Sequence, residues 1–183
     1  MKYAFKFVGV SIAAIALASL ALAQEGRIYR EGGAWVQEVT GNLSGAKNLR
    51  VKLDSGSVKV QGGSQSDITF VIHRRSYTGS EERARREFES NRITTTVKGD
   101  TALIFAQGSG NHNGKCSDEL VVNVPRSTDL AKVETGGGNV SVTAISGRTE
   151  IETGGGTIHV DDIGGEVTAE TGGGTGWARF SCA

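Results

Sequence analysis

Proline, aromatic residues and net charge are all scarce in this chain. It has one proline but 27 glycines among 183 residues, a composition typical of short strands joined by tight turns. Beyond the first 23 residues, 18 basic side chains face 20 acidic ones, a net charge of −2. This balance gives no sequence-independent attraction to nucleic acid. The few aromatic residues argue against a cleft in which sugar rings stack.

Long apolar runs are absent beyond the first 23 residues. Lys2 and Lys6 form a short basic region, an apolar run follows from 7 to 20, and Ala21-Leu22-Ala23 is a small-x-small cleavage site. The run is shorter than the roughly 20 residues that a spanning helix needs. We therefore predict a cleaved signal peptide over residues 1–23 rather than a membrane anchor, and an exported chain located in the periplasm, cell envelope or extracellular space.

Cysteine is nearly absent too. An oxidising compartment would allow Cys116 and Cys182 to form one disulfide. Two free thiols, or a bond to a partner chain, are the alternatives. Nucleophile elbows, Walker loops, dinucleotide fingerprints and paired-histidine metal motifs are not found, so no cofactor is predicted.

The sequence does contain an internal repeat. The string Glu-Thr-Gly-Gly-Gly begins at Glu134, Glu152 and Glu170, a period of 18 residues. Fixed self-similarity of this kind indicates a repeat architecture. Apolar residues fall into columns at the same spacing, and one column holds Val133, Ile151 and Ala169. The residues predicted to point inward are Val140, Val142, Ile145, Ile158, Val160 and Ile163.

The repeat predicts an all-β fold in which 18-residue coils stack in a β-solenoid-like arrangement. Each coil would contain two short strands, with like residues about 4.8 Å apart in successive coils. An antiparallel meander or sandwich is the alternative. Glycine would serve the corners because tight turns require a positive φ. The predicted corner glycines are Gly136, Gly137, Gly138, Gly147, Gly154, Gly155, Gly156 and Gly165.

Other segments are less regular. Residues 24–48 are weakly patterned, and only Trp35, Val36 and Val39 are expected to reach a core. A single β-repeat domain is predicted over 49–183, beginning with a degenerate first coil from about Leu49. A short surface helix is predicted near 80–91, with Ser80 as its N-cap. One hairpin is also predicted, with its two strands on either side of residues 98–100.

The third copy of the repeat loses its apolar column after Thr175, where Gly176, Ala178 and Ser181 stand at inward positions. We expect residues 175–183 to be poorly ordered, or to pack irregularly through Trp177 and Phe180. Either the tail caps the stack, or the domain is truncated. The exposed rung near Glu166–Glu170 could then pair edge to edge with another chain.

The repeat region offers three candidates for a chemical site. A calcium-binding nonapeptide roll needs an aspartate ahead of its hydrophobic residue, and here Asn139 and Thr157 occupy that place. Glu134, Glu152 and Glu170 should form an outward column, which is either solvated or bridged by cations. Asp161 and Asp162 could serve a β-helix polysaccharide enzyme. No catalytic, cofactor-binding or metal site is predicted.

The exported chain, with its LRVKLDSGSVKV opening and repeated VETGGGxVxV units, resembles the bacterial putative-adhesin family, a domain long described as of unknown function. The resemblance covers about Leu49 to Gly174. It implies a β-solenoid-like domain in a cell-envelope protein, with adhesion as the expected role and no catalytic residues. A self-assembling scaffold and a β-helix polysaccharide enzyme are the alternatives, and the macromolecular partner is unknown.

Overall fold

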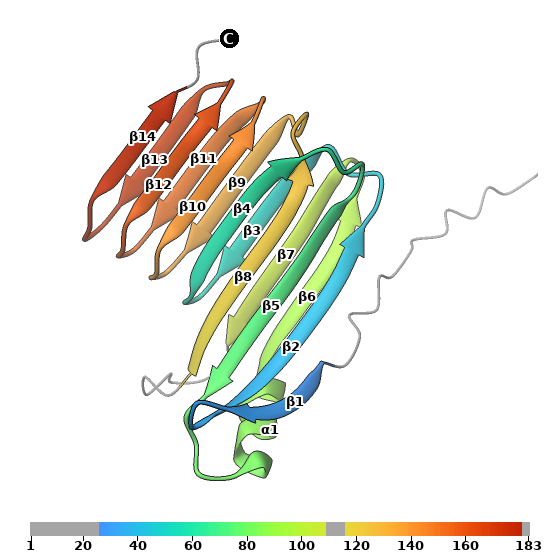
Figure 1. Ribbon diagram of the computed structural model, residues 1–183, viewed down its shortest axis with the longest axis vertical. Coiled ribbons are helices and arrows are strands. Elements are labelled where there is room, and N and C mark those ends of the chain that lie inside the picture. Colours follow the sequence, from blue (N-terminus) through green and yellow to red (C-terminus); the bar gives the residue numbers. More distant parts are fainter. Residues whose placement is uncertain (1–25, 109–115, 181–183) are drawn as a thin grey trace, which may run out of the picture.

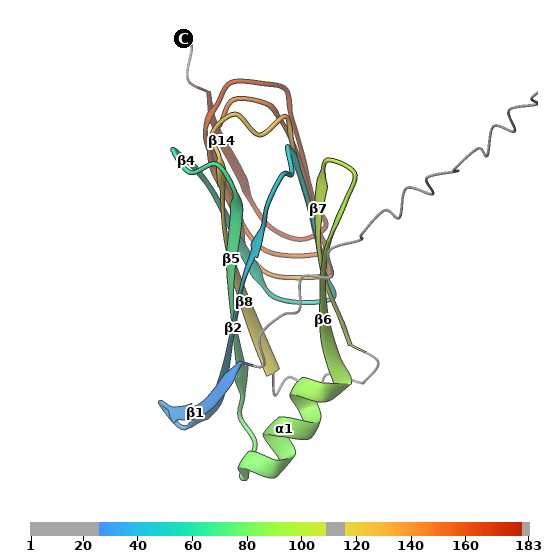
Figure 2. The ribbon, with the colours of Figure 1, turned by 90° about the vertical axis from the view of Figure 1, so that its right-hand side faces the viewer.

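The computed structural model describes residues 26–108 and 116–180. These residues form fourteen strands and one helix, arranged as two mixed β-sheets that face each other (Figures 1 and 2). A continuous core of valine, leucine and isoleucine side chains fills the space between the two sheets. The predicted signal peptide and Cys182 lie outside the described residues. Within them, no helix is long and apolar enough to cross a membrane.

The first sheet has eight strands in the order β1-β2-β5-β8-β4-β10-β12-β14. Their bounds are β1 Arg27–Glu31, β2 Ala34–Leu43, β4 Ser57–Gly63, β5 Ile68–Ser76, β8 Cys116–Pro125, β10 Val140–Ile145, β12 Ile158–Ile163 and β14 Gly176–Phe180. The second sheet has six strands in the order β13-β11-β9-β3-β7-β6. Their bounds are β3 Asn48–Leu53, β6 Asn91–Lys98, β7 Thr101–Gly108, β9 Leu130–Thr135, β11 Arg148–Thr153 and β13 Val167–Thr171.

The 18-residue period of the sequence sets the register of the paired strands, because residues 18 apart lie opposite each other. Each repeat gives one strand to the six-stranded sheet and one to the eight-stranded sheet, and equivalent strands of successive repeats pair in parallel. Val142 is the register partner of Val160, and Ile151 lies between Val133 and Ala169. All six residues predicted to point inward are buried, so the column assignment is confirmed.

The degenerate first repeat also joins the stack. β3 pairs with β9 and β4 pairs with β10, both in parallel, which places Val51 opposite Val133 and Val58 opposite Val140. The chain then departs from the repeat. β5 lies outside the repeat and pairs antiparallel with β2 and β8. The predicted hairpin around residues 98–100 is confirmed as β6 and β7.

The mostly β fold with one short helix is confirmed, and its two mixed sheets differ between the repeats and the N-terminal part of the chain. Strands of the repeats pair in parallel, so the antiparallel meander is wrong for that region. The N-terminal part, with β1, β2, β5, β6, β7 and β8, contains antiparallel pairs. Parallel pairing at the period of the repeat thus describes only part of the chain.

Residues 24–48 contribute more than their pattern indicated. They form β1 and β2. Val36 and Val39 are buried as predicted, Trp35 is only half-buried, and Leu43 and Ala46 are buried as well. Gly41 is the reason that the alternation was hard to see. It lies opposite Phe70 in the register, and a Cβ atom at Gly41 would come within 2.4 Å of the Phe70 ring. A glycine thus occupies a core position because its neighbour's ring needs the space.

The predicted helix is α1, Glu81–Ser90, and it lies at the foot of the molecule between the two layers (Figure 2). The Ser80 side chain accepts a hydrogen bond from the Arg83 N–H at 3.4 Å, as expected of an N-cap. Ala84 and Phe88 are buried. Because two apolar residues one turn apart share one face of a helix, this pair fixes the side of α1 that packs inward.

The expectation that residues 175–183 are poorly ordered is wrong for the backbone of Gly176–Phe180, whereas packing through the Trp177 and Phe180 side chains lies outside what the structure describes. Gly176–Phe180 forms β14, which pairs in parallel with β12 and shifts register between Asp161 and Ile163. A ladder is made by backbone groups, so a strand can continue where the inward side chains become small. Residues 181–183 lie outside the described residues.

Candidate binding face

The threonine of each Glu-Thr-Gly-Gly-Gly string ties one repeat to the previous one. Thr135 Oγ1 donates to the carbonyl oxygen of Gly56 at 3.1 Å, and Thr153 Oγ1 donates to that of Gly138, also at 3.1 Å. Thr171 repeats the contact with Gly156 at 3.2 Å. Thr135 and Thr153 are buried. Sequence reasoning missed this role, although the recurrence of threonine beside the glycines was its signal.

The corner glycines are required for two different reasons. Gly138 and Gly156 have φ values of 130° and 129°, as the turn argument predicted. Gly136 and Gly154 do not, and the explanation by positive φ is wrong for them. A Cβ at Gly154 would lie 2.3 Å from the carbonyl oxygen of Gly136, one repeat earlier. Close stacking of backbones is therefore the reason for glycine there.

The remaining predicted corner glycines have no positive φ, and only two of them make close backbone contacts. A Cβ at Gly147 would come within 2.2 Å of the Asp129 carbonyl oxygen, and one at Gly165 within 2.4 Å of the Gly147 carbonyl oxygen. Gly137 has no atom within 4 Å of the position of a Cβ, and at Gly155 the nearest atom is 3.7 Å away. The middle glycine of each triplet is therefore the one that the stack does not require.

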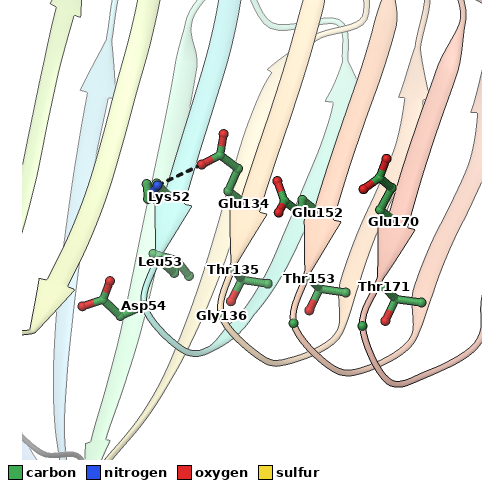
Figure 3. Close-up of a pocket in the computed structure, with 12 residues that line it drawn as sticks. Lys52, Leu53, Asp54, Glu134, Thr135, Gly136, Glu152, Thr153, Glu170 and Thr171 are labelled. Carbon is green, nitrogen blue, oxygen red and sulfur yellow. Dashed lines mark hydrogen bonds and ion pairs between the residues drawn. The ribbon is translucent and has the colours of Figure 1, made fainter.

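A row of charged side chains lies on the outer surface of the six-stranded sheet, next to these corners. Glu134, Glu152 and Glu170 are register partners on β9, β11 and β13, which confirms the predicted outward column. Lys52 of β3 begins the row, because β3 aligns with β9. Figure 3 shows the three carboxylates in line above the row of threonines. Lys52 was missed because its sequence match to the later repeats is weak.

Ion pairs connect the first strands of this face in a zigzag. Lys52 Nζ lies 3.1 Å from Glu134, and Lys132 Nζ lies 3.3 Å from Glu134 and 3.4 Å from Glu150. Arg148 Nε continues the series, 3.1 Å from Glu150 and 3.6 Å from Glu166. The alternating charges thus run diagonally across β3, β9 and β11 to the residue just before β13.

These contacts shift two pKa values in opposite directions. Hydrogen bonds to Glu134 and then to Glu150 raise the pKa of Lys132 above its ordinary value. Burial pushes the pKa of Glu134 upward, but the hydrogen bonds from Lys52 and Lys132 outweigh it, and the pKa of Glu134 is lowered. Both groups are therefore charged over the physiological pH range.

Beyond the zigzag the face becomes acidic. Glu152 and Glu170 are exposed, and neither forms an ion pair within the described part of the chain. Together with Glu134, the threonines and the first corner glycines, they line a groove of about 600 Å³ (Figure 3). We define the candidate binding face as the outer surface of β3, β9, β11 and β13, including this groove.

The other residues considered for chemistry are not brought together. Asp162 accepts two hydrogen bonds from the Arg126 guanidinium, at 2.6 and 2.9 Å, so its carboxylate is engaged in a bidentate pair. His73 lies 3.5 Å from Glu38, on the antiparallel part of the eight-stranded sheet. Within residues 26–108 and 116–180, no three His, Cys, Asp or Glu side chains are placed to hold a metal ion.

Cys116 lies at the start of β8, next to α1. Its Sγ donates to Glu87 at 3.2 Å, and burial together with the Glu87 carboxylate raises its pKa to about 12. It is a free thiol in the structure. Because Cys182 lies outside the described residues, the Cys116–Cys182 disulfide stays a prediction.

Comparison with known proteins gives structural matches only. No protein-family model matches the chain, and no curated protein matches its sequence. A putative cell adhesion protein from Clostridium sporogenes matches with a TM-score of 0.51 at 12% identity, covering 80% of this chain and all of the other. The chain is similar in fold to this putative cell adhesion protein. The predicted resemblance is thus confirmed as a structural similarity at low sequence identity.

Two further solved structures match more weakly. A putative lipid binding protein from Parabacteroides distasonis has a TM-score of 0.39 at 12% identity, with coverage of 83% of this chain and 74% of the other. A putative adhesin from Bacteroides fragilis has a TM-score of 0.33 at 8% identity, with coverage of 76% and 96%. At these scores the matches add nothing on function. The adhesion-protein match supports the fold alone.

Proposed function

We propose that this protein is an exported, non-catalytic cell-envelope or surface protein that binds another macromolecule through the candidate binding face. The repeats form a short β-solenoid in this proposal, and the antiparallel strands with α1 form its base. The observation that carries the proposal is the repetition of the face. Equivalent side chains recur on neighbouring strands about 4.8 Å apart, so an extended partner meets the same groups more than once.

The chemistry of the face suits binding better than catalysis. Its carboxylates either pair with lysine and arginine side chains or lie in an open groove. General acid–base catalysis depends on carboxyl groups with matched, perturbed pKa values. Glu134 lines the groove, and its lowered pKa holds its carboxylate in the charged form. The fold of the adhesion protein from Clostridium sporogenes, which spans most of this chain, supports the same reading.

A binding experiment with immobilised macromolecules tests this proposal. The probes are peptidoglycan, an acidic polysaccharide, collagen and poly-L-lysine, and binding of the purified exported chain is followed by surface plasmon resonance. We expect saturable binding to at least one probe, weakened by the double variant Glu152→Gln/Glu170→Gln. The matched control is Glu82→Gln/Glu89→Gln, which removes the same charge from exposed positions of α1. Equal loss in both variants would show only a dependence on net charge.

The polysaccharide-enzyme alternative is tested separately. The chain is incubated with the acidic polysaccharide, and new reducing ends are measured. We expect none above the buffer control. Turnover that is abolished by Asp161→Asn would contradict the non-catalytic proposal. Asp161 lies outside the candidate binding face, so this result would be independent of binding by that face.

A further inference from the structure

The six-stranded sheet ends at β13, and within the described part of the chain no strand pairs with the outer edge of β13. The Glu166 carbonyl and the Gly172 N–H are bonded to β11. Because backbone groups of successive strand residues point to opposite sides, Val167, Ala169 and Thr171 direct theirs to the open edge. This edge therefore has donors and acceptors available for another strand.

The core is also uncovered at this edge. Val133 and Ile151 are 0% and 3% exposed. Ala169, the next residue of the same column, is exposed to solvent. Val167 of the same strand is half-buried and packs against the core. Pairing at this edge would therefore bury apolar surface as well as satisfy backbone groups.

The opposite end of the molecule is protected. There α1 packs between the sheets (Figure 2), with Ala84 and Phe88 buried. The edge strands at that end are β6 of the six-stranded sheet, which carries Arg92 and Lys98, and β1 of the eight-stranded sheet, which carries Arg27, Arg30 and Glu31. Charged residues and covering helices are the usual protection of edge strands. Open-ended stacking of copies would pair the β13 edge with these charged edge strands, whereas the pairing of two β13 edges avoids them.

We propose that a second copy of this chain pairs with β13, antiparallel and about a two-fold axis at Ala169, so that the protein forms a closed dimer. In this register Thr168 of one copy lies opposite Glu170 of the other, and Val167 lies opposite Thr171. A parallel, in-register pairing would instead place Glu170 opposite Glu170, which like charges disfavour. A two-fold interface closes on itself and does not propagate.

The dimer would extend the candidate binding face. The two six-stranded sheets would become one continuous sheet, with both outer surfaces on the same side. An extended partner could then contact two copies of the face, and linked sites gain apparent affinity without any new contact. The dimer itself does not depend on the proposed function, because its interface is the edge of the sheet and not the outer surface.

The test compares two lysine substitutions on the same strand. Ala169→Lys places a charge at the pairing edge, where Ala169 is already exposed, whereas Thr168→Lys places the same charge on the outer surface. Sedimentation velocity over a wide concentration range should show a dimer for the wild type and for Thr168→Lys. Ala169→Lys should raise the dissociation constant about a hundredfold or more, since an unpaired charge would be buried.

A cross-linking variant keeps the proposal testable if Ala169→Lys does not fold. In a Cys182→Ser background, Ala169→Cys should give a covalent dimer on mild oxidation, because residues opposite each other at the axis have a Cα separation of about 5.5 Å. Glu89→Cys on α1 should not. A monomeric wild type, an unaffected Ala169→Lys dimer, open-ended filaments, or no cross-link at Ala169→Cys would each overturn the proposal. None of these outcomes bears on binding by the outer face.

Discussion

Thr153 Oγ1 lies 3.1 Å from the carbonyl oxygen of Gly138, a residue of the preceding repeat, and 3.1 Å from that of Gly155 in its own corner. Its single proton is shared between the two corners. The threonine is 2% exposed, so water does not replace these contacts. This hydroxyl therefore links successive repeats at their glycine corners.

We expect Thr153→Val to destabilise the protein although valine has nearly the same shape. The substitution removes the hydroxyl group that donates to the carbonyl oxygens of Gly138 and Gly155. Loss of this hydrogen bond should lower the free energy of unfolding by about 1–2 kcal/mol. Urea denaturation of both proteins measures the difference. Thr153→Ser should recover most of the loss, since it keeps the hydroxyl. A valine variant as stable as the wild type would show that the contact contributes nothing net.

The two glycine explanations are separated by Gly154→Ala and Gly155→Ala. A Cβ at Gly154 would overlap the Gly136 carbonyl, so the alanine should force the repeats apart and cost about 1–3 kcal/mol. At Gly155 the nearest atom is 3.7 Å away and φ is not left-handed, so alanine should be neutral or stabilise by up to about 1 kcal/mol. Thermal melting checks both. Similar losses at the two positions would mean that turn geometry, not backbone contact, selects glycine.

The repeat region is the part of the fold that the sequence predicts best. A period of 18 residues assigns register partners such as Val142 and Val160 directly, because equivalent residues of stacked repeats must lie side by side. The inward columns and the outward glutamates follow from the same period. Helix α1 was also predictable, since Ser80, Ala84 and Phe88 are local signals.

The antiparallel part and the charge zigzag depend on contacts that no local pattern encodes. β5 pairs with β2 and β8, which precede and follow it at long separations, and Gly41 hides the alternation of β2. Lys52 meets Glu134 across 82 residues. Even the strand β14 could not be predicted from its residues, because its pairing relies on backbone groups that every sequence possesses.

The ion pairs of Glu134 should make stability depend on pH in the acid range. Its folded pKa lies below the ordinary value of 4.5, so the stabilisation is fully present above that value. It is lost as the pH falls through the lowered folded pKa. Unfolding free energies measured at neutral and acid pH should therefore converge between the wild type and Glu134→Gln. A difference that persists unchanged in acid would indicate a packing role instead.

Cys116 should be an unreactive thiol while the protein is folded. Only the thiolate reacts with iodoacetamide, and a pKa of about 12 leaves very little thiolate at mildly alkaline pH. In a Cys182→Ser background, we expect modification at least about tenfold slower than in urea, where Cys116 returns to an ordinary pKa. Glu87→Gln should accelerate the folded-state reaction, because it removes the carboxylate beside Sγ. The rates are followed by intact mass.

The wild-type chain, analysed by mass spectrometry without reduction, tests the predicted disulfide. An alkylated Cys116 would exclude its bond to Cys182, whereas protection of Cys116 in the wild type beyond that in the Cys182→Ser chain would support the bond.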